Sequence, residues 1–324
     1  MRQISEAAPP SRDLFDHLAL PLICAPMFLV SYPELIIAAC RQNIGAACSA
    51  MSARSSEEYD EWLDRIEAAR AEHLASGAEG AGLVATNLTL RSGKDGARAR
   101  YESDLLVCKR RRSPLVITIN GAPDEVVQEV HGWGGMVFHD VTSIRHAQKA
   151  AAAGVDGMIL IASGGGGHSG ALNPFTLVSA VREFFDGYLV LAGAITNGAH
   201  LRAARALGAD LCYMGTRFIA TRESGAPQAY KQMLVEARAS DLLFTPYFTH
   251  GVPANILKPS IAAAGYDPAA LPDRLTQPPR EDKRAWRDIW SAGQGTELIR
   301  DIPTVAGLVG RLREEYRAAA ARMA

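Results

Sequence analysis

Residues 159–170 read ILIASGGGGHSG, and the interpretation of the whole chain starts from this stretch. Its first half is an apolar run typical of a buried strand, and its second half contains four glycines followed by His168. Glycines let backbone amides approach a ligand, and a histidine beside them can transfer a proton near neutral pH. Asn173 and Pro174 come next and favour a helix start. The stretch therefore predicts a strand, a glycine loop with a histidine, and a helix.

Other apolar runs of similar length precede and follow this strand, and helical patterns separate them. These runs are apolar throughout, as expected for parallel strands that are buried on both faces. The predicted strands lie at 20–27, 44–50, 82–87, 114–120, 135–140, 156–162, 188–192 and 210–214. Eight strands that alternate with helices are the pattern of a (β/α)8 TIM barrel.

A doubly wound open sheet is the alternative α/β fold. Its glycine-rich nucleotide loop would follow the first strand, where this chain has Ala25, Pro26 and Met27. The glycine loops of this chain instead follow the sixth, seventh and eighth strands, which favours the barrel.

The sequence changes character after the eighth strand. Residues 1–225 are predicted to form the barrel, and residues 226–290 a smaller, mainly helical lid domain over its mouth. Within the lid, segment 241–280 is rich in proline, tyrosine and phenylalanine. Residues 291–324 are expected to pack back on the barrel and to end in a helix.

The composition excludes several classes of function. With 324 residues, 48% of them hydrophobic, and a net charge of -1, the chain gives no electrostatic argument for binding nucleic acid or an anionic membrane. No apolar run of about 20 residues could span a bilayer, and the polar start predicts no signal peptide. The five cysteines have no C-x-x-C spacing, so we expect free thiols in a reducing cytoplasm and no metal site.

The loops after the last two strands are candidates for binding a phosphate, as is common in such barrels. Gly193 and Ala194 lie in the seventh loop, and Gly215 and Thr216 lie in the eighth. Their backbone amides could bind a phosphate without a lysine.

The rest of a phosphate-bearing cofactor would lie over the mouth of the barrel. Ala25, Pro26 and Met27 follow the first strand, while Asn87 ends the third and His168 lies in the sixth loop. This lining suits a flavin ring, which is flat and apolar with a polar edge. The loops accommodate one phosphate, and no early G-x-G-x-x-G is present for a pyrophosphate, so FMN is expected rather than FAD.

Several motifs resemble the signature of the nitronate monooxygenase family, formerly called 2-nitropropane dioxygenases. The main ones are glycine-glycine-histidine-x-glycine at 166–170 and methionine-glycine-threonine-arginine-phenylalanine at 214–218. Further matches lie at 25–27, 154–157, 207–210, 220–224 and 291–295. The resemblance covers almost the whole chain.

This resemblance implies an FMN-binding barrel in which Gly166 and Gly167 join the loops on the phosphate side and His168 faces the substrate. Many members carry Glu-Ala or Glu-Ser where this chain has Gly164 and Gly165, so a carboxylate near the histidine is missing. A more usual Gly-Gly is replaced by Gly193-Ala194 in the seventh loop.

The expected function is an FMN-dependent oxidation of alkyl nitronates by dioxygen to carbonyl compounds, with His168 as the catalytic residue. The alternative is a flavin reductase that uses NAD(P)H on an enoyl thioester or a quinone, as relatives with the same motifs do. A flavin-binding scaffold without turnover is a third hypothesis. A small-molecule substrate and dioxygen are the expected partners, and a homodimer is left open.

Several other residues are weaker candidates for a role at the site. His139 and Asp140 end the fifth strand and either approach the flavin or form a structural hydrogen bond. Tyr247, Phe248 and His250 are candidates to line a substrate pocket, and this apolar composition favours a substrate larger than a small nitroalkane. Trp286 and Trp290, spaced one helical turn apart, are interpreted as core packing.

Overall fold

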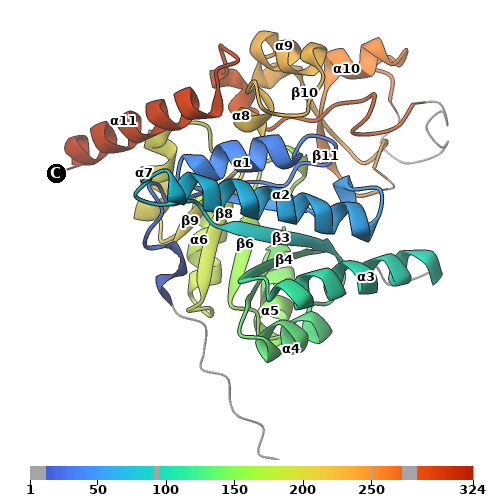
Figure 1. The fold of residues 1–324 in the computed structure, drawn as a ribbon. Helices are drawn as coiled ribbons and strands as arrows, with labels where there is room; N and C mark the ends of the chain where they lie inside the picture. The colour runs from blue at the N-terminus through green and yellow to red at the C-terminus, as the bar shows by residue number, and fades with distance from the viewer. Residues whose placement is uncertain (1–11, 91–94, 250, 272–282, 324) are drawn as a thin grey trace, which may run out of the picture.

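The computed structural model describes residues 12–90, 95–249, 251–271 and 283–323, and a closed parallel barrel forms its centre (Figure 1). The barrel order is β1-β2-β3-β4-β5-β6-β8-β9. These strands are β1 (Leu22–Cys24), β2 (Gly45–Ser49), β3 (Val84–Thr89), β4 (Leu115–Ile119), β5 (Met136–Val141), β6 (Gly157–Ile161), β8 (Tyr188–Ala192) and β9 (Leu211–Met214). The predicted TIM barrel is therefore confirmed.

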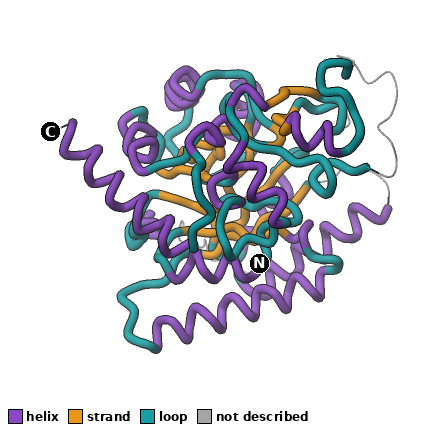
Figure 2. Tube along the Cα trace, turned by 90° about the horizontal axis from the view of Figure 1, so that it is seen from above, coloured by secondary structure: helices purple, strands orange, loops and turns teal. Residues whose placement is uncertain are grey.

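Helices surround the strands, as the view from above in Figure 2 shows. They are α1 (Pro33–Arg41), α2 (Ser56–Ala75), α3 (Asp95–Arg111), α4 (Asp124–Gly132), α5 (Ile144–Ala152), α6 (Pro174–Arg182), α7 (Gly198–Ala206) and the short α8 (Thr216–Ile219). Local sequence determines where several of them begin. Asn173 Oδ1 accepts a hydrogen bond from the backbone N of Phe175, and Pro174 occupies the first turn of α6.

The two faces of each strand are buried against different partners. On β5, Met136 and Phe138 belong to the core inside the barrel, whereas Val137 and Val141 belong to the core between the barrel and its helices. Because side chains alternate along a strand, both faces need apolar residues. This double burial explains the continuous apolar runs of the sequence.

A smaller unit follows the barrel and lies above it in Figure 1. It contains α9 (Gln228–Glu236), β10 (Leu242–Thr245), β11 (Ala254–Leu257) and α10 (Lys258–Ala263). The sequence analysis did not predict β10 and β11. They form an antiparallel sheet in the order β10-β11-β7, and β7 (Gly167–His168) comes from the sixth loop of the barrel. The lid is thus attached to the glycine loop by backbone pairing.

The last helix, α11 (Val305–Met323), packs on α7. The Glu315 carboxylate accepts a hydrogen bond of 2.8 Å from the backbone N of Gly198. A Cβ atom at Gly198 would lie 2.2 Å from the carbonyl oxygen of Leu312, so the contact requires glycine. The two helices therefore approach each other at backbone distance.

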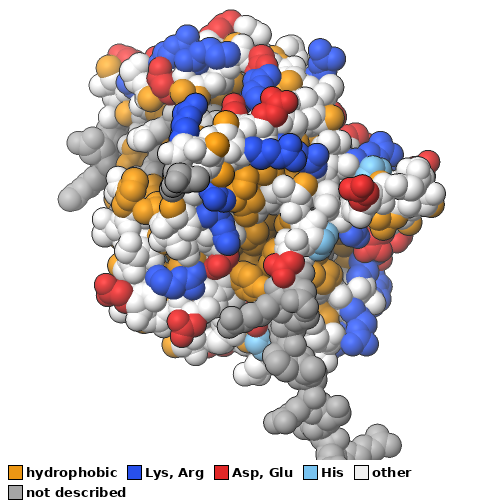
Figure 3. All heavy atoms as spheres, turned by 90° about the vertical axis from the view of Figure 1, so that its left-hand side faces the viewer, with side chains coloured by type: hydrophobic (Ala, Val, Ile, Leu, Met, Phe, Trp, Pro, Cys, Tyr) orange, Lys and Arg blue, Asp and Glu red, His pale blue; other side chains and the backbone are white. Residues whose placement is uncertain are grey.

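The surface has apolar areas of its own. Figure 3 shows apolar side chains gathered near the middle of one face, with Lys and Arg side chains around them. Phe175 in α6 and Phe184 just after it are among the exposed large apolar residues. Within the described ranges, no helix combines the length and apolar character needed to cross a bilayer. The five cysteines are all free and buried, as predicted.

The close packing before β3 gives a prediction about stability. A Cβ atom at Gly82 would lie 1.8 Å from the carbonyl oxygen of Ile44, so Gly82→Ala requires a backbone shift. We expect it to lower the free energy of unfolding by about 2 kcal/mol or more, measured by urea titration. Gly96→Ala is the matched control because its Cβ would meet open space in α3. It should raise the free energy of unfolding by up to about 1 kcal/mol. A Gly82→Ala protein as stable as the parent would contradict this packing.

Candidate active site

The predicted site residues come to one rim of the barrel, where the carboxyl ends of its parallel strands meet. Ala25, Pro26 and Met27 follow β1, and Asn87 lies in β3. The glycine loops follow β6, β8 and β9. The arrangement of the strands thus brings together segments that are far apart in the sequence.

The first and eighth loops are in contact. The backbone N of Ala25 donates to the carbonyl oxygen of Met214 at 3.0 Å. A Cβ atom at Gly215 would lie 3.5 Å from Sδ of Met27 and 3.7 Å from Cβ of Ala25. Asn87 lies apart from this pair of loops, because β3 is three strands from β9 in the barrel order.

The sixth loop joins the same cluster through Gly166. A Cβ atom there would lie 3.0 Å from Oγ1 of Thr216 and 2.9 Å from the backbone N of Gly293. Gly293 itself donates a hydrogen bond of 2.9 Å to the Thr216 hydroxyl. Three segments of the chain therefore meet here at backbone distance, and only glycine fits.

The seventh loop has a left-handed backbone at both predicted residues. Gly193 has φ +113° and Ala194 has φ +56°. A Cβ atom at Gly193 would lie 3.0 Å from the carbonyl oxygen of Ala162, so this position needs glycine. At Ala194 the conformation is strained, and such strain is frequent at functional sites.

Hydrogen bonds from two residues, Asn255 and Gln294, hold the glycine loop. Nδ2 of Asn255 donates to the carbonyl oxygen of Gly165 at 2.7 Å and to Oγ of Ser169 at 3.2 Å. The backbone N of Gln294 donates to the carbonyl oxygen of Gly164 at 2.9 Å. The sequence analysis missed Asn255, which is 90 positions from its partner and gives no local signal.

His168 lies on the small sheet, directly opposite Ala254 of β11. Its ring meets the Trp286 ring edge-on, with the centroids 5.6 Å apart. Partial burial lowers the pKa of His168 below its ordinary value, and backbone hydrogen bonds to Pro253 and Val252 act against this effect. The imidazole is therefore neutral at pH 7 and can accept a proton.

The core packing expected for the two tryptophans is confirmed, although they do not lie on one helix. Residues 286 and 290 do not share a helix: Trp286 has φ +70° in a turn. Trp290 stacks on Tyr230 with the ring centroids 4.9 Å apart, as core packing requires. Trp286 packs against the apolar core of the small unit and also contacts the candidate catalytic histidine, which the spacing does not predict.

The other lid candidates are core residues. Tyr247 and Phe248 are buried and pack edge-on against each other and against Tyr266. His250 lies outside the described residues. This cluster stabilises the small unit, and the two described aromatic residues do not line the cavity described below.

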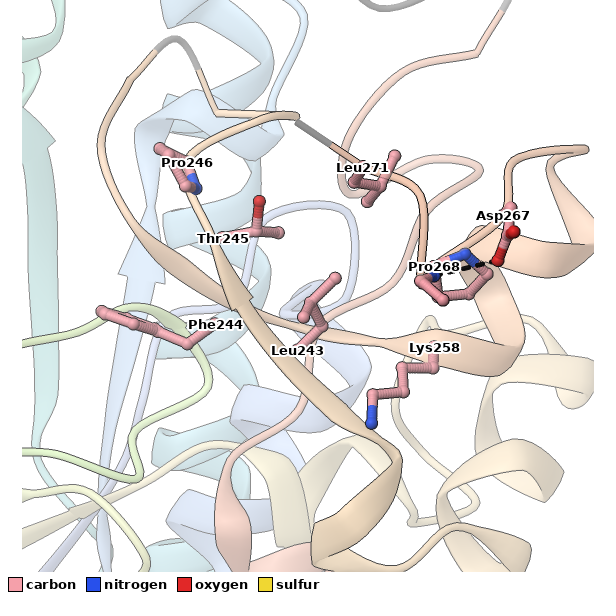
Figure 4. A pocket seen from close by; sticks show the side chains of 9 residues that line it. Leu243, Phe244, Thr245, Pro246, Lys258, Asp267, Pro268 and Leu271 are labelled. Atoms are coloured by element: carbon pink, nitrogen blue, oxygen red, sulfur yellow. Dashed lines mark hydrogen bonds between the residues drawn. The ribbon is translucent and has the colours of Figure 1, made fainter. Parts of the chain in front are cut away.

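A cavity of about 670 Å³ lies in the small unit, between β10 and the residues after α10 (Figure 4). Its polar lining includes Thr245, Lys258 and Asp267, while the exposed Phe244 is part of its wall. No site residue predicted from the sequence lines it. The cavity is thus separate from the rim where the glycine loops meet.

Buried polar groups without partners mark the inside of the barrel. Oδ1 of Asp140 and the hydroxyl of Tyr213 are buried and make no hydrogen bond. Nδ1 of the neighbouring His139 instead lies 2.8 Å from Oγ1 of Thr118, and burial lowers the pKa of His139 to about 4. Of the two interpretations given above, the structural hydrogen bond holds for His139. In the described ranges, no group of three or more His, Cys, Asp or Glu side chains could hold a metal ion.

The sequence profile of the family described as nitronate monooxygenase matches residues 64–315. This chain belongs to the nitronate monooxygenase family. The matched range contains the glycine loops, His168 and Thr216.

Some proteins similar to this chain are named as nitronate monooxygenases, and others as carboxyl-CoA dehydrogenases. The chain is 35% identical over 138 residues to the (3aS,4S,5R,7aS)-5-hydroxy-7a-methyl-1-oxo-octahydro-1H-indene-4-carboxyl-CoA dehydrogenase of Rhodococcus jostii (strain RHA1), covering 42% of this chain and 38% of the relative. It is 28% identical over 228 residues to a nitronate monooxygenase of Paraburkholderia phytofirmans (strain DSM 17436 / LMG 22146 / PsJN), covering 63% and 61%. A solved nitroalkane oxidase of Streptomyces ansochromogenes superposes with a TM-score of 0.76 at 26% identity, covering 96% of this chain and 100% of that one.

The contact between Asn255 and the glycine loop predicts a local effect. Asn255→Ala should speed hydrogen exchange of the backbone amides in residues 163–170 by about tenfold, since two hydrogen bonds to this loop are lost. Mass spectrometry of deuterated peptides measures this exchange. As a control, Asn197→Ala removes a helix cap of similar chemistry at α7 and should leave the loop unchanged. Equal exchange in the parent and in Asn255→Ala would show that the loop is held by other contacts.

Proposed function

We propose that this protein is an FMN-dependent oxidoreductase that oxidises alkyl nitronates with dioxygen to carbonyl compounds. The observation that carries the proposal is the family match over residues 64–315. The likeness to a solved nitroalkane oxidase over 96% of the chain supports it. The glycine loops and His168, at the rim and under the small unit, provide the residues for it.

The residues at the rim fit a flavin mononucleotide. In the proposal, the backbone amides of Gly166, Gly167, Gly193, Ala194 and Gly215 bind the phosphate. At Gly166 and Gly193 a Cβ atom would lie 2.9 to 3.0 Å from another segment, so the backbone itself lines the site there. Buried polar atoms without partners inside the barrel also suit a ligand with a polar edge.

The side chain of Thr216 adds a donor to this set. Its oxygen accepts the hydrogen bond from Gly293, so its own hydroxyl hydrogen remains available for a phosphate oxygen. Ala25, Pro26 and Met27 would contact the ring, and Asn87 its polar edge. The bound flavin would supply the two-electron oxidation and the reaction with dioxygen.

His168 is the proposed proton acceptor. A neutral imidazole has one N–H donor and one nitrogen that accepts. When the N–H donates to the backbone at Val252 or Pro253, the other nitrogen can take the α-proton of a neutral nitroalkane. Trp286 fixes the edge of the ring and so limits its rotation.

The second candidate is an NAD(P)H-dependent reductase that acts on an enoyl thioester or a quinone. The match at 35% identity to a relative named as a carboxyl-CoA dehydrogenase favours a coenzyme A thioester as the substrate of this alternative. Gly164 and Gly165, in place of the more usual acidic residue and its neighbour, also separate this chain from many nitronate-oxidising members.

We also propose a reducing cytoplasm as the location, with a small-molecule substrate and dioxygen as the partners. The five free, buried cysteines support this location, because disulfides are rare in that compartment. A homodimer stays a prediction, and the exposed Phe175 and Phe184 are candidates for its contact.

Anaerobic mixing separates the two candidate functions. We expect an alkyl nitronate to bleach the absorbance of the bound flavin within seconds, while NADPH leaves it unchanged, since only the nitronate is a reductant in the proposed reaction. Stopped-flow absorbance follows both. Rapid bleaching by NADPH, with none by the nitronate, would replace the first candidate by the second.

The role of His168 is tested by substitution. His168→Ala should keep the flavin, because the proposed phosphate contacts come from backbone amides, but should lower kcat by about 10² to 10⁴ with a neutral nitroalkane. His146→Ala, on the exposed face of α5, is the control and should retain activity. Near-normal turnover of His168→Ala with bound flavin would mean that this histidine has only a structural role.

A further inference from the structure

The inner layer of the barrel contains a carboxyl group without a partner. Side chains alternate along β5, and Met136 and Phe138 point inward, so Asp140 also points inward at the carboxyl end. Its Oδ1 is buried and makes no hydrogen bond. This carboxyl group therefore faces the interior at the same end as the glycine loops.

Apolar residues flank Asp140 on both adjacent strands. The neighbouring strands contribute the inward residues Ile117, Ile159 and Ile161. Tyr213 of β9 also points inward, is 7% exposed, and has a buried hydroxyl without a hydrogen bond. Burial and then the charge of Asp140 raise the pKa of Tyr213, and both side chains point into the interior of the barrel.

Burial favours the protonated form of the Asp140 carboxyl at neutral pH. Burial raises the pKa of its carboxyl to about 8, and within the described residues no cation offsets this effect. A protonated carboxyl has one O–H donor. Because the buried Oδ1 has no partner within the chain, an acceptor from outside the chain would satisfy a protonated carboxyl at this place.

The position of Asp140 indicates which ligand supplies that acceptor. Ala25 and Asn87, both predicted to contact the cofactor, belong to the same inner layer of the barrel. His168, predicted to face the substrate, lies instead on the small sheet. Asp140 therefore lies with the predicted cofactor contacts in the barrel, and not with His168 on the small sheet.

We propose that Asp140 is a further cofactor-binding residue, whose neutral carboxylic acid donates a hydrogen bond to an acceptor atom on the polar edge of the flavin ring. The hydroxyl of Tyr213 is the second donor available there. This inference rests on the proposed function, because it requires a flavin at the mouth of the barrel.

The proposal predicts how the affinity for FMN changes with pH. An ionised Asp140 cannot donate and would place a negative charge beside acceptor atoms, so FMN must bind the protonated form more tightly. The affinity should therefore be constant below pH 8 and fall above it, by up to about tenfold per pH unit for one proton. The ionisations of FMN itself affect every variant equally.

Fluorescence titration of FMN into flavin-free protein between pH 6.5 and 9.5 tests this. The parent should show a Kd that rises about tenfold from pH 8.5 to 9.5. Asp140→Asn, which keeps a donor and has no charge, should vary by less than about twofold over that range. Asp140→Leu should bind about tenfold more weakly than Asp140→Asn at every pH, because it has no donor. Asp124→Asn, on the exposed start of α4, is the control and should keep the parent's profile.

The absorption bands of the bound flavin provide a second readout, which a purely structural role would not move. At pH 7 they should differ between the parent and Asp140→Leu, which cannot donate to the ring edge, and Asp140→Asn should lie close to the parent. If Asp140→Asn weakens in parallel with the parent above pH 8, another group titrates and the inference is wrong while the proposed function stands. If the parent binds no flavin at any pH, the proposed function is wrong and this inference with it.

Discussion

Two backbone pairs, Ala254 with His168 and Asn255 with Gly167, connect the small unit to the barrel. A loop of four glycines has no side chains with which to hold its own conformation, and its large conformational freedom opposes order. The pairing supplies the missing hydrogen bonds, and the Asn255 amide adds two more. Since β7 belongs to the sixth loop and β11 to the small unit, any displacement of that unit would carry the histidine with it. The position of the proposed proton acceptor therefore depends on the position of the small unit.

The interior of the barrel combines a stable core with an unsatisfied end. Most of its inward side chains are apolar and fully buried, from Phe138 to Ile117. The polar groups without partners, on Asp140 and Tyr213, lie where the strands end. Burying such groups without partners costs free energy of folding, and the apolar layers offset this cost. The same groups can form hydrogen bonds with a ligand.

The sequence was sufficient for the barrel because its signals are local. Continuous apolar runs, helix caps such as Asn173 and glycines at strand ends act within a few residues. The strands β10 and β11 were missed because each has four residues and is stabilised by pairing with distant segments. The contact of Trp286 with His168 was missed because it depends on a turn with positive φ that the residue spacing does not indicate. Asp140 could be named from the sequence, but only the structure separates its unpaired carboxyl from the bonded ring of His139.

The backbone conformation of Ala194 has a consequence for the thermodynamics of binding at the proposed FMN site. In its left-handed conformation the methyl group costs strain that glycine would avoid, yet it removes many conformations that glycine could adopt. The seventh loop therefore loses less conformational entropy when it becomes ordered. A loop that is already restricted before the ligand arrives has less freedom to lose on binding, so more of the contact energy appears as affinity. In this chain, a single methyl group exchanges backbone strain for preorganisation.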